Sequence, residues 1–149
     1  MIVKGSDGIC HVAQHVRQTL LPAMADPYLM TDLRFTAMCL DLIAEDYDRA
    51  VDVMVADREE IVKIFDTALP YLKDELRIRV GQRLGCEAKD LRVRSLSLRA
   101  DDDLLVLIEL HRVSEDGEVS GETWAADVNA KIWRFIENYA ERRKYNSPI

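Results

Sequence analysis

The sequence predicts an all-α protein, a compact up-and-down bundle of five or six helices in one domain. The first observation is a single apolar stripe that keeps its phase from Leu29 to about Val80. Its members follow one another at three- and four-residue steps or sums of these, which keeps side chains on one side of an α-helix. They are Leu29, Leu33, Leu40, Ile43, Tyr47, Val51, Met54, Ile61, Phe65, Leu69, Leu72 and Leu76. The second observation is a similar stripe near the end of the chain, and the third is a set of helix start and stop residues.

Composition fits one ordinary domain. The chain has 149 residues, 48% of them hydrophobic and 32% charged, which is enough apolar material for a single core without a disulfide or metal. The net charge of −7 disfavours binding to phosphate backbones, so we expect no nucleic-acid partner. No run of apolar residues is long enough to span a membrane. Three cysteines without a CxxC pair, and no signal peptide, predict a cytoplasmic protein.

The first helix is expected from about Ile9 to Leu21. Residues 1–8 are expected to form a flexible arm, because Gly5, Ser6, Asp7 and Gly8 are helix breakers. The stripe of this helix consists of Ile9, Val12, Val16 and Leu20. Pro22 disturbs its end. Asp26 then fits an N-cap, with Pro27 at the first helical position.

A long helix begins near Pro27, and its end is open. It runs at least to about Ala56, where Asp57 and Glu60 have the spacing of a capping box and offer a stop and restart. The unbroken stripe instead favours one helix of about 40 residues, on the order of 60 Å long. A break would fold the next helix back on this one. A helix of that length would need a partner to cover it.

The middle of the chain is harder to assign. Pro70 interrupts the stripe, and a helix from about Tyr71 to Leu84 is expected to stop at Gly85. Residues 86–100 fit neither the helical nor the strand period. Asp101, Asp102 and Asp103 are interpreted as an N-cap cluster before a buried helix that starts with the apolar run 104–108. A β-hairpin over about 91–113 is the main alternative.

The last helix is expected from near Glu122 to about Lys144, after a loop over 115–121 that contains Asp116 and Gly117. Its inward residues are Trp124, Val128, Ile132, Phe135, Ile136 and Tyr139, with Trp133 near the other edge. Residues 145–149 are expected to form a tail. The basic residues Arg134, Arg142, Arg143 and Lys144 complement the dipole at the C-terminal end of this helix.

One carboxylate ladder is a candidate metal site. Its members lie at steps of four, three and four residues on one flank of the long helix; they are Asp41, Glu45, Asp48 and Asp52. Stacked carboxylates suit a hard divalent cation such as Mg²⁺. The segment Glu45-Asp46-Tyr47-Asp48 resembles half of the metal-binding pattern of all-α nucleotide pyrophosphohydrolases of the MazG type. The preceding Glu-Glu-x-x-Glu of that family is absent. The other reading of the ladder is a solvated flank paired with nearby Arg or Lys.

The histidines give a second metal hypothesis. His11 and His15 are four residues apart, a spacing that can chelate zinc on a helix, and His111 is the third histidine. In residue count this resembles the DinB-like metal-binding bundles, which carry their close His pair late in the chain. The stripe of the first helix points both His11 and His15 to solvent, which favours ordinary surface histidines. His111 is expected to pair with Glu115 at i,i+4.

Two further residues, Glu109 and Cys39, are expected to have structural roles. Glu109 lies near the core side of its helix, so it needs a cation, which Arg99, Arg92 or Lys131 would supply. Cys39 fits a small buried apolar residue.

The function expected from these patterns is a non-enzymatic one. A long amphipathic stretch without a catalytic signature favours a helical protein that acts through protein–protein contacts, as a homodimer or as an accessory to another protein. The alternative is a metal-dependent hydrolase of a phosphate ester or anhydride, with the carboxylate ladder as ligands and a metal-activated water. A third possibility is a carrier whose apolar pocket is lined by Met30, Met38, Met54, Phe35 and Trp124.

Overall fold

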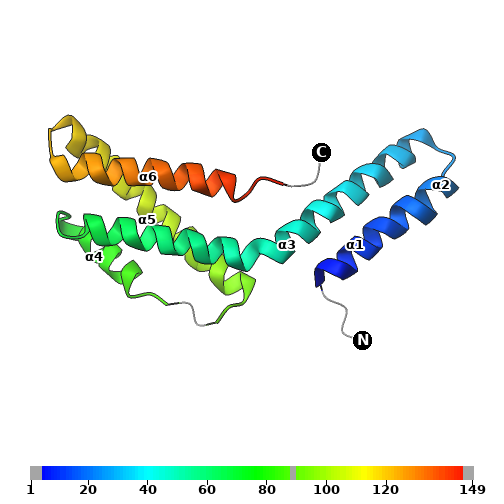
Figure 1. Cartoon of the computed structure of the whole chain (residues 1–149), viewed down its shortest axis with the longest axis horizontal. Helices are drawn as coiled ribbons and strands as arrows, with labels where there is room; N and C mark the ends of the chain where they lie inside the picture. The colour runs from blue at the N-terminus through cyan, green and yellow to red at the C-terminus, as the bar shows by residue number, and fades with distance from the viewer. Residues whose placement is uncertain (1–4, 88–89, 146–149) are drawn as a thin grey trace. The chain divides into compact units, whose positions relative to one another are not determined.

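The structure is a computed structural model that describes residues 5–87 and 90–145 (Figure 1). Throughout these residues the chain forms helices joined by turns, with no strand, so the all-α prediction is confirmed. The elements are α1 (Gly5–His15), a π-helical turn (Val16–Leu20), α2 (Leu21–Ala23), α3 (Pro27–Ala68), α4 (Asp74–Leu84), α5 (Val93–Val119) and α6 (Thr123–Glu141). No helix among them is both long and apolar enough to cross a bilayer.

The contacts between Cα atoms divide the chain into two compact units. Among the described residues, unit 1 contains 5–50 and 145, and unit 2 contains 51–87 and 90–144. Helix α3 contributes residues to both. The expectation of a single domain stays a prediction, because this grouping does not test it.

Helix α3 is continuous, which decides the question that the sequence left open. It begins as predicted, with the backbone N–H of Tyr28 donating to Oδ1 of Asp26 at 2.8 Å. It does not stop at Asp57, so the stop-and-restart alternative is wrong. The Asp57 carboxylate accepts hydrogen bonds from arginines near the end of α6 instead of capping a new helix.

In unit 1, α1 lies antiparallel to the first half of α3 (Figure 1). Helix α1 starts at Gly5, so the expected arm is wrong for residues 5–8, while residues 1–4 lie outside the described part. The Tyr47 ring explains the glycine there. A Cβ on Gly5 would lie 2.6 Å from Cε1 of Tyr47, so only glycine fits without a shift.

The stripe expected for the first helix is wrong in register. Ala13 and Val16 are buried, while Val12 is 53% and Leu20 is 38% exposed. The π-helical turn over Val16–Leu20 inserts an extra residue into one turn, which rotates Leu20 away from the line of Val16. The side of α1 that faces α3 is therefore formed by smaller residues than the pattern suggested.

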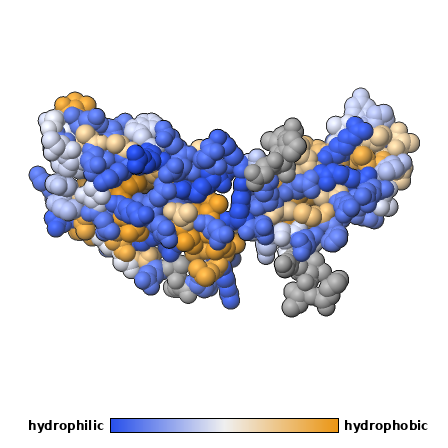
Figure 2. Space-filling model, viewed as in Figure 1, coloured by the Kyte–Doolittle hydropathy of each residue, from blue (hydrophilic) through white to orange (hydrophobic). Residues whose placement is uncertain are grey.

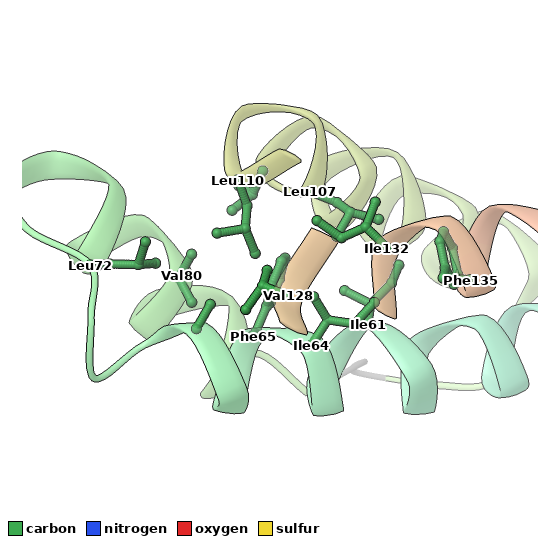
Figure 3. Packing of buried hydrophobic residues seen from close by; sticks show 12 residues of the cluster. Ile61, Ile64, Phe65, Leu72, Val80, Leu107, Leu110, Val128, Ile132 and Phe135 are labelled. Carbon is green, nitrogen blue, oxygen red and sulfur yellow. The ribbon is translucent and has the colours of Figure 1, made fainter. Parts of the chain in front are cut away.

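The main core lies in unit 2, where the second half of α3 meets α4, α5 and α6 (Figure 3). Its buried apolar members are Ile61, Ile64, Phe65, Ala68, Leu72, Val80, Val106, Leu107, Leu110, Val128, Ile132 and Phe135. Six of the residues that the two stripes placed inside this part of the chain are among them: Ile61, Phe65, Leu72, Val128, Ile132 and Phe135. Full burial of each large side chain contributes about 1.5–3 kcal/mol, which makes this cluster the main source of stability of unit 2.

Helix α5 corrects three expectations. It covers residues 93–119, so the β-hairpin alternative is wrong, and Asp101–Asp103 lie inside the helix instead of capping it. It also continues through Gly117, where a loop was expected. A Cβ on Gly117 would lie 2.8 Å from the Cβ of Ala125, so this glycine allows α5 and α6 to approach closely.

The remaining helix ends differ from expectation by a few residues. Helix α4 starts at Asp74, three residues later than expected, because Tyr71 lies in the turn and stacks on Trp124 with ring centroids 5.4 Å apart. It ends before Gly85 as predicted. Helix α6 ends at Glu141, and the next residues form a turn from which Arg142 and Arg143 reach Asp57.

Candidate functional site

The carboxylate ladder lies along α3, and two of its members are paired with arginines. Arg17 on the π-helical turn binds Asp41, and this bond raises the pKa of Arg17 above its ordinary value. Glu45 accepts a hydrogen bond from Arg49 at 3.3 Å. Asp48 and Asp52 are exposed. In the described part of the chain no group of three or more His, Cys, Asp or Glu side chains is arranged to hold a metal ion. The metal role of the ladder stays a prediction.

The histidines lie where the sequence placed them. His11 and His15 are exposed on α1. On α5, Nε2 of His111 is 3.7 Å from Oε1 of Glu115, which confirms the i,i+4 pair. The His111 ring also meets the Trp133 ring edge-on, with centroids 5.4 Å apart.

The expectation for Glu109 is wrong. Its side chain is exposed and pairs with Arg79 of α4, not with Arg99, Arg92 or Lys131. Glu109 directly precedes the buried Leu110, so the helix turns it about 100° from the core direction, where α4 supplies the cation.

A buried carboxylate at Asp103 joins three helices of unit 2. Nη1 of Arg58 on α3 donates to it at 3.1 Å, and Nε of Arg83 on α4 donates at 2.7 Å. Nη2 of Arg58 also donates to the backbone carbonyl oxygen of Arg83 at 2.6 Å and to that of Cys86 at 3.2 Å. Asp103 is 1% exposed, so the two guanidinium groups replace the water that its charge requires.

A second buried carboxylate, Asp57, joins α3 to the end of α6. Nε of Arg142 donates to it at 2.8 Å and Nη2 of Arg143 donates at 2.6 Å. The Arg143 guanidinium also lies over the Tyr139 ring, 3.3 Å from its centroid.

The neighbouring Glu60 completes this cluster. Burial raises the pKa of Glu60, but hydrogen bonds from Arg142 and Asn138 outweigh it, so the pKa lies below its ordinary value. Burial likewise lowers the pKa of Arg142, and its bonds to Glu60 and Asp57 reverse that effect, so its pKa is raised. Both groups are therefore held in their charged forms.

Sequence reasoning missed these two clusters because it assigned local roles to their members. Asp57 and Asp103 were interpreted as capping residues, and Arg142 and Arg143 as partners of a helix dipole. The periodicity itself carried a signal. Asp57 is followed by buried Ile61 and Ile64, and Asp103 by buried Val106 and Leu110, at three-, four- and seven-residue steps. An aspartate on the apolar stripe of its helix is predicted to be buried and paired.

Unit 1 carries a candidate interaction surface. Within the described part of this unit the buried hydrophobic residues are only Ala13, Val16, Ala37 and Ala44. Larger apolar side chains remain half-exposed beside them; Val12, Leu29, Ile43 and Tyr47, here called the hairpin face, are 50–56% exposed. Figure 2 shows hydrophobic patches among hydrophilic residues on the surface that α1 and the first half of α3 form. Within one chain, this pair of helices therefore leaves its larger apolar side chains half-exposed to water and buries mainly small ones.

Unit 2 carries a second apolar surface between α5 and α6. A groove of about 310 Å³ there is lined by Leu104, Leu107, Ile108, His111, Ile132, Phe135, Ile136 and Tyr139. Ile108 is 65% and Ile136 is 40% exposed, although both were expected to face the core. Three of its lining residues, Leu107, Ile132 and Phe135, also belong to the core cluster of unit 2.

The other candidate residues do not form a common pocket or site in the part of the chain that the structure describes. Phe35, expected in a carrier pocket, is 62% exposed in unit 1, whereas Trp124 stacks on Tyr71 in unit 2. The three cysteines are free; Cys10 is exposed, while Cys39 and Cys86 are half-buried.

Comparison of the chain with protein-family models, with curated proteins and with solved structures finds no match.

Proposed function

We propose that this protein acts through protein–protein contacts, as a homodimer whose two copies meet along the hairpin face. The observation that supports this most is that unit 1 buries small apolar residues and leaves larger ones half-exposed. Its two helices and the π-helical turn bury three alanines and Val16, while Val12, Leu29, Ile43 and Tyr47 stay half-exposed. Two helices with so small a core gain stability when another apolar surface covers the larger side chains.

The exposed residues of the two helices belong to one side of the hairpin. Val12 directly precedes the buried Ala13, and Ile43 directly precedes the buried Ala44. One position is about 100° of rotation on an α-helix, so each exposed residue is offset by the same angle from its buried neighbour. Because α1 and α3 are antiparallel, equal offsets turn both residues to the same side of the pair.

The size of this face suits a second copy. The part of α3 from Pro27 to Ala50 is about 36 Å long, and two helices side by side are about 20 Å wide. The resulting area of about 700 Å² is close to the roughly 800 Å² that each partner buries in a standard interface. Two hairpins packed through this face would form a four-helix bundle, the arrangement that closes such surfaces most simply.

The location that we propose is the cytoplasm. An odd number of cysteines without a CxxC pair favours a compartment where thiols stay reduced.

Sedimentation velocity over a dilution series tests the homodimer. We expect the full chain to sediment as a dimer that dissociates on dilution. The double substitution Val12→Glu and Ile43→Glu should weaken the dimer roughly a hundredfold, because it places charges in a dry interface.

The matched control is Phe35→Glu. Phe35 is similarly exposed on α3, but it lies two positions before the buried Ala37 and thus on the back of that helix. This variant should dimerise like the unmodified chain, and far-UV circular dichroism should show native helicity in both variants. A chain that stays monomeric at every accessible concentration would contradict the proposal, as would equal weakening by Phe35→Glu.

A further inference from the structure

The apolar groove between α5 and α6 has a buried floor and exposed rims. Its floor contains Leu107, Ile132 and Phe135, which are at most 4% exposed and belong to the core of unit 2 (Figure 3). On the rims, Ile108 of α5 and Ile136 of α6 remain 65% and 40% exposed. The groove is therefore part of the packing of unit 2, and it is separate from the hairpin face, which belongs to unit 1.

The apolar surface continues beyond the groove on both helices. Leu105 lies three positions before Ile108 on α5 and is 59% exposed, and Trp133 lies three positions before Ile136 on α6 and is 52% exposed. Residues three apart on a helix are neighbours on its surface. A small apolar molecule inside the groove would leave Leu105 and Trp133 in water, whereas a longer structure lying over the groove would cover them.

Two unpaired charges stand at the ends of the apolar stretch on α5. Asp101 lies four positions before Leu105, and Arg112 lies four positions after Ile108, so all four residues follow one flank of the helix. Both charged side chains are exposed, and neither forms an ion pair with another residue that the structure describes. They are eleven positions apart, which is about 16 Å along the helix.

The size of this surface favours a single helix over a second copy of the chain. A length of about 16 Å and a width of about 20 Å for two adjacent helices give an area of about 320 Å². This is less than half of the roughly 800 Å² that each partner buries in a standard interface. One α-helix is about 10 Å across, so it fits lengthwise between α5 and α6 at the usual interaxial distance of about 8–10 Å.

We propose that the groove binds one amphipathic α-helix of another protein, which carries a cation at the end facing Asp101 and a carboxylate at the end facing Arg112. Apolar side chains of that helix, at three- and four-residue steps, enter the groove between Ile108 and Ile136. The opposite charges at its ends complement the two unpaired charges of α5 and fix its direction on the groove. This partner is additional to the second copy proposed for the hairpin face, and the small area makes its binding transient.

Fluorescence anisotropy of a labelled synthetic helix tests the site on the full chain. The peptide has about 16 residues, leucines along one face at the spacing of an amphipathic helix, and a glutamate and a lysine at its ends with the same separation as Asp101 and Arg112. We expect saturable binding to the full chain and none for a scrambled peptide of the same composition. Binding should persist in the double variant Val12→Glu and Ile43→Glu, because the groove belongs to unit 2.

Ile108→Glu should weaken binding of this peptide roughly tenfold or more, because it places a charge where apolar side chains enter the groove. The matched control is Ile78→Glu on α4, since Ile78 is 62% exposed and does not line the groove. This control should bind the peptide as the unmodified chain does. Far-UV circular dichroism should show native helicity in both variants.

Arg112→Glu tests the charge pattern. It makes both ends of the stretch anionic, so the mixed-charge peptide should bind roughly two- to fivefold more weakly, and a peptide with lysine at both ends should become the preferred one. The control Arg77→Glu makes the same charge change at an exposed arginine of α4 and should leave the preference for the mixed-charge peptide unchanged.

The proposal is overturned if the mixed-charge peptide does not bind, if the scrambled peptide binds equally well, or if Ile78→Glu weakens binding as much as Ile108→Glu. It is also overturned if Arg112→Glu leaves the order of peptide affinities unchanged. Two results would assign the groove to another occupant. Self-association that persists in the Val12→Glu and Ile43→Glu variant and is lost with Ile108→Glu would identify a second copy, and saturable binding of hexanol without binding of the peptide would identify a small apolar ligand.

Discussion

Asp57 and Asp103 are carboxylates placed on the apolar stripes of their helices, and each is held by two arginines from other elements. An apolar residue in either position would extend the core. The aspartates instead select arginines from the end of α6 and from α4, which fixes the register of these segments on α3 and α5. A buried charge without its partner costs several kcal/mol, so packings that separate these groups are strongly disfavoured.

Glu60 allows this residue-scale argument to be tested by pH. Its folded-state pKa lies below the ordinary value of 4.5 because Arg142 and Asn138 bind the ionised form. The ionised carboxylate therefore contributes stability that is present above the unfolded pKa and is lost as the pH falls through the folded pKa. We expect Glu60→Gln to lower the free energy of unfolding at pH 7 and to have a smaller effect below pH ~4.

Urea unfolding of the full chain at the two pH values measures this difference. The control is Glu59→Gln, since Glu59 is the adjacent, exposed carboxylate on the same helix. Its effect on stability should be small at both pH values. A Glu60→Gln effect that does not change with pH would show that the ionised form is not what stabilises the cluster.

At the scale of helices, the sequence was sufficient for the all-α class and for part of the unit 2 core, but not for Leu29, Ile43 and Tyr47, which are half-exposed, and not for the helix ends. The stripe correctly identified Ile61, Phe65 and Leu72 as core residues and the start of α3 at Pro27, because both depend on local periodicity and a local cap. The ends of α5 depend on contacts distant in sequence. Asp103 lies inside the helix, where Arg58 and Arg83 compensate its charge, and Gly117 lies inside it at the point where Ala125 approaches closely. Rules that consider only neighbouring residues instead place a helix start at Asp103 and a loop at Gly117.

The same distinction holds for the candidate sites. The His111–Glu115 pair was predictable because both residues are on one helix. The partner of Glu109 was not, since Arg79 is brought to it by the packing of α4 on α5. The arginine clusters around Asp57 and Asp103 likewise require separate helices in their final places, and no spacing within one helix contains that information.

The packing between helices can be tested by making the same substitution, glycine to alanine, at two glycines inside helices. Gly117→Ala should destabilise the protein by about 1–3 kcal/mol, because the new Cβ would lie 2.8 Å from the Cβ of Ala125 and force α5 and α6 apart. Gly81→Ala in α4 should stabilise it by about 0.5–1 kcal/mol, because a Cβ there meets no atom within 4 Å and alanine favours the helix.

Thermal or urea unfolding of the two variants beside the unmodified chain gives both values. Opposite signs are the decisive result, since the chemical change is identical and only the surroundings differ. A stabilising Gly117→Ala would mean that α5 and α6 separate easily at this point and that the glycine is not needed for their packing.

At the scale of the whole molecule, the two units are built with very different cores. Unit 2 buries twelve hydrophobic residues in one cluster, eleven from four helices and Leu72 from the turn between α3 and α4. The buried hydrophobic residues in the described part of unit 1 are three alanines and Val16. Buried apolar area sets most of the local stability, so unit 1 in an isolated chain should open far more readily than unit 2.

Hydrogen–deuterium exchange of the full chain at several protein concentrations tests this difference together with the proposed homodimer. In dilute protein, amides of α1 and of residues 27–50 should exchange much faster than those of residues 61–69 and 104–110, whose side chains form the unit 2 core. At higher concentration the hairpin face becomes covered, and binding stabilises a folded segment in proportion to the logarithm of partner concentration. Protection of unit 1 should therefore rise with concentration, while protection of the unit 2 core should stay constant.

The double variant Val12→Glu and Ile43→Glu removes the partner but not the helices, so its unit 1 should exchange quickly at every concentration. If unit 1 is as protected as unit 2 even in the most dilute sample, its stability comes from within one chain, and the small buried residues at Ala13, Ala37 and Ala44 must suffice.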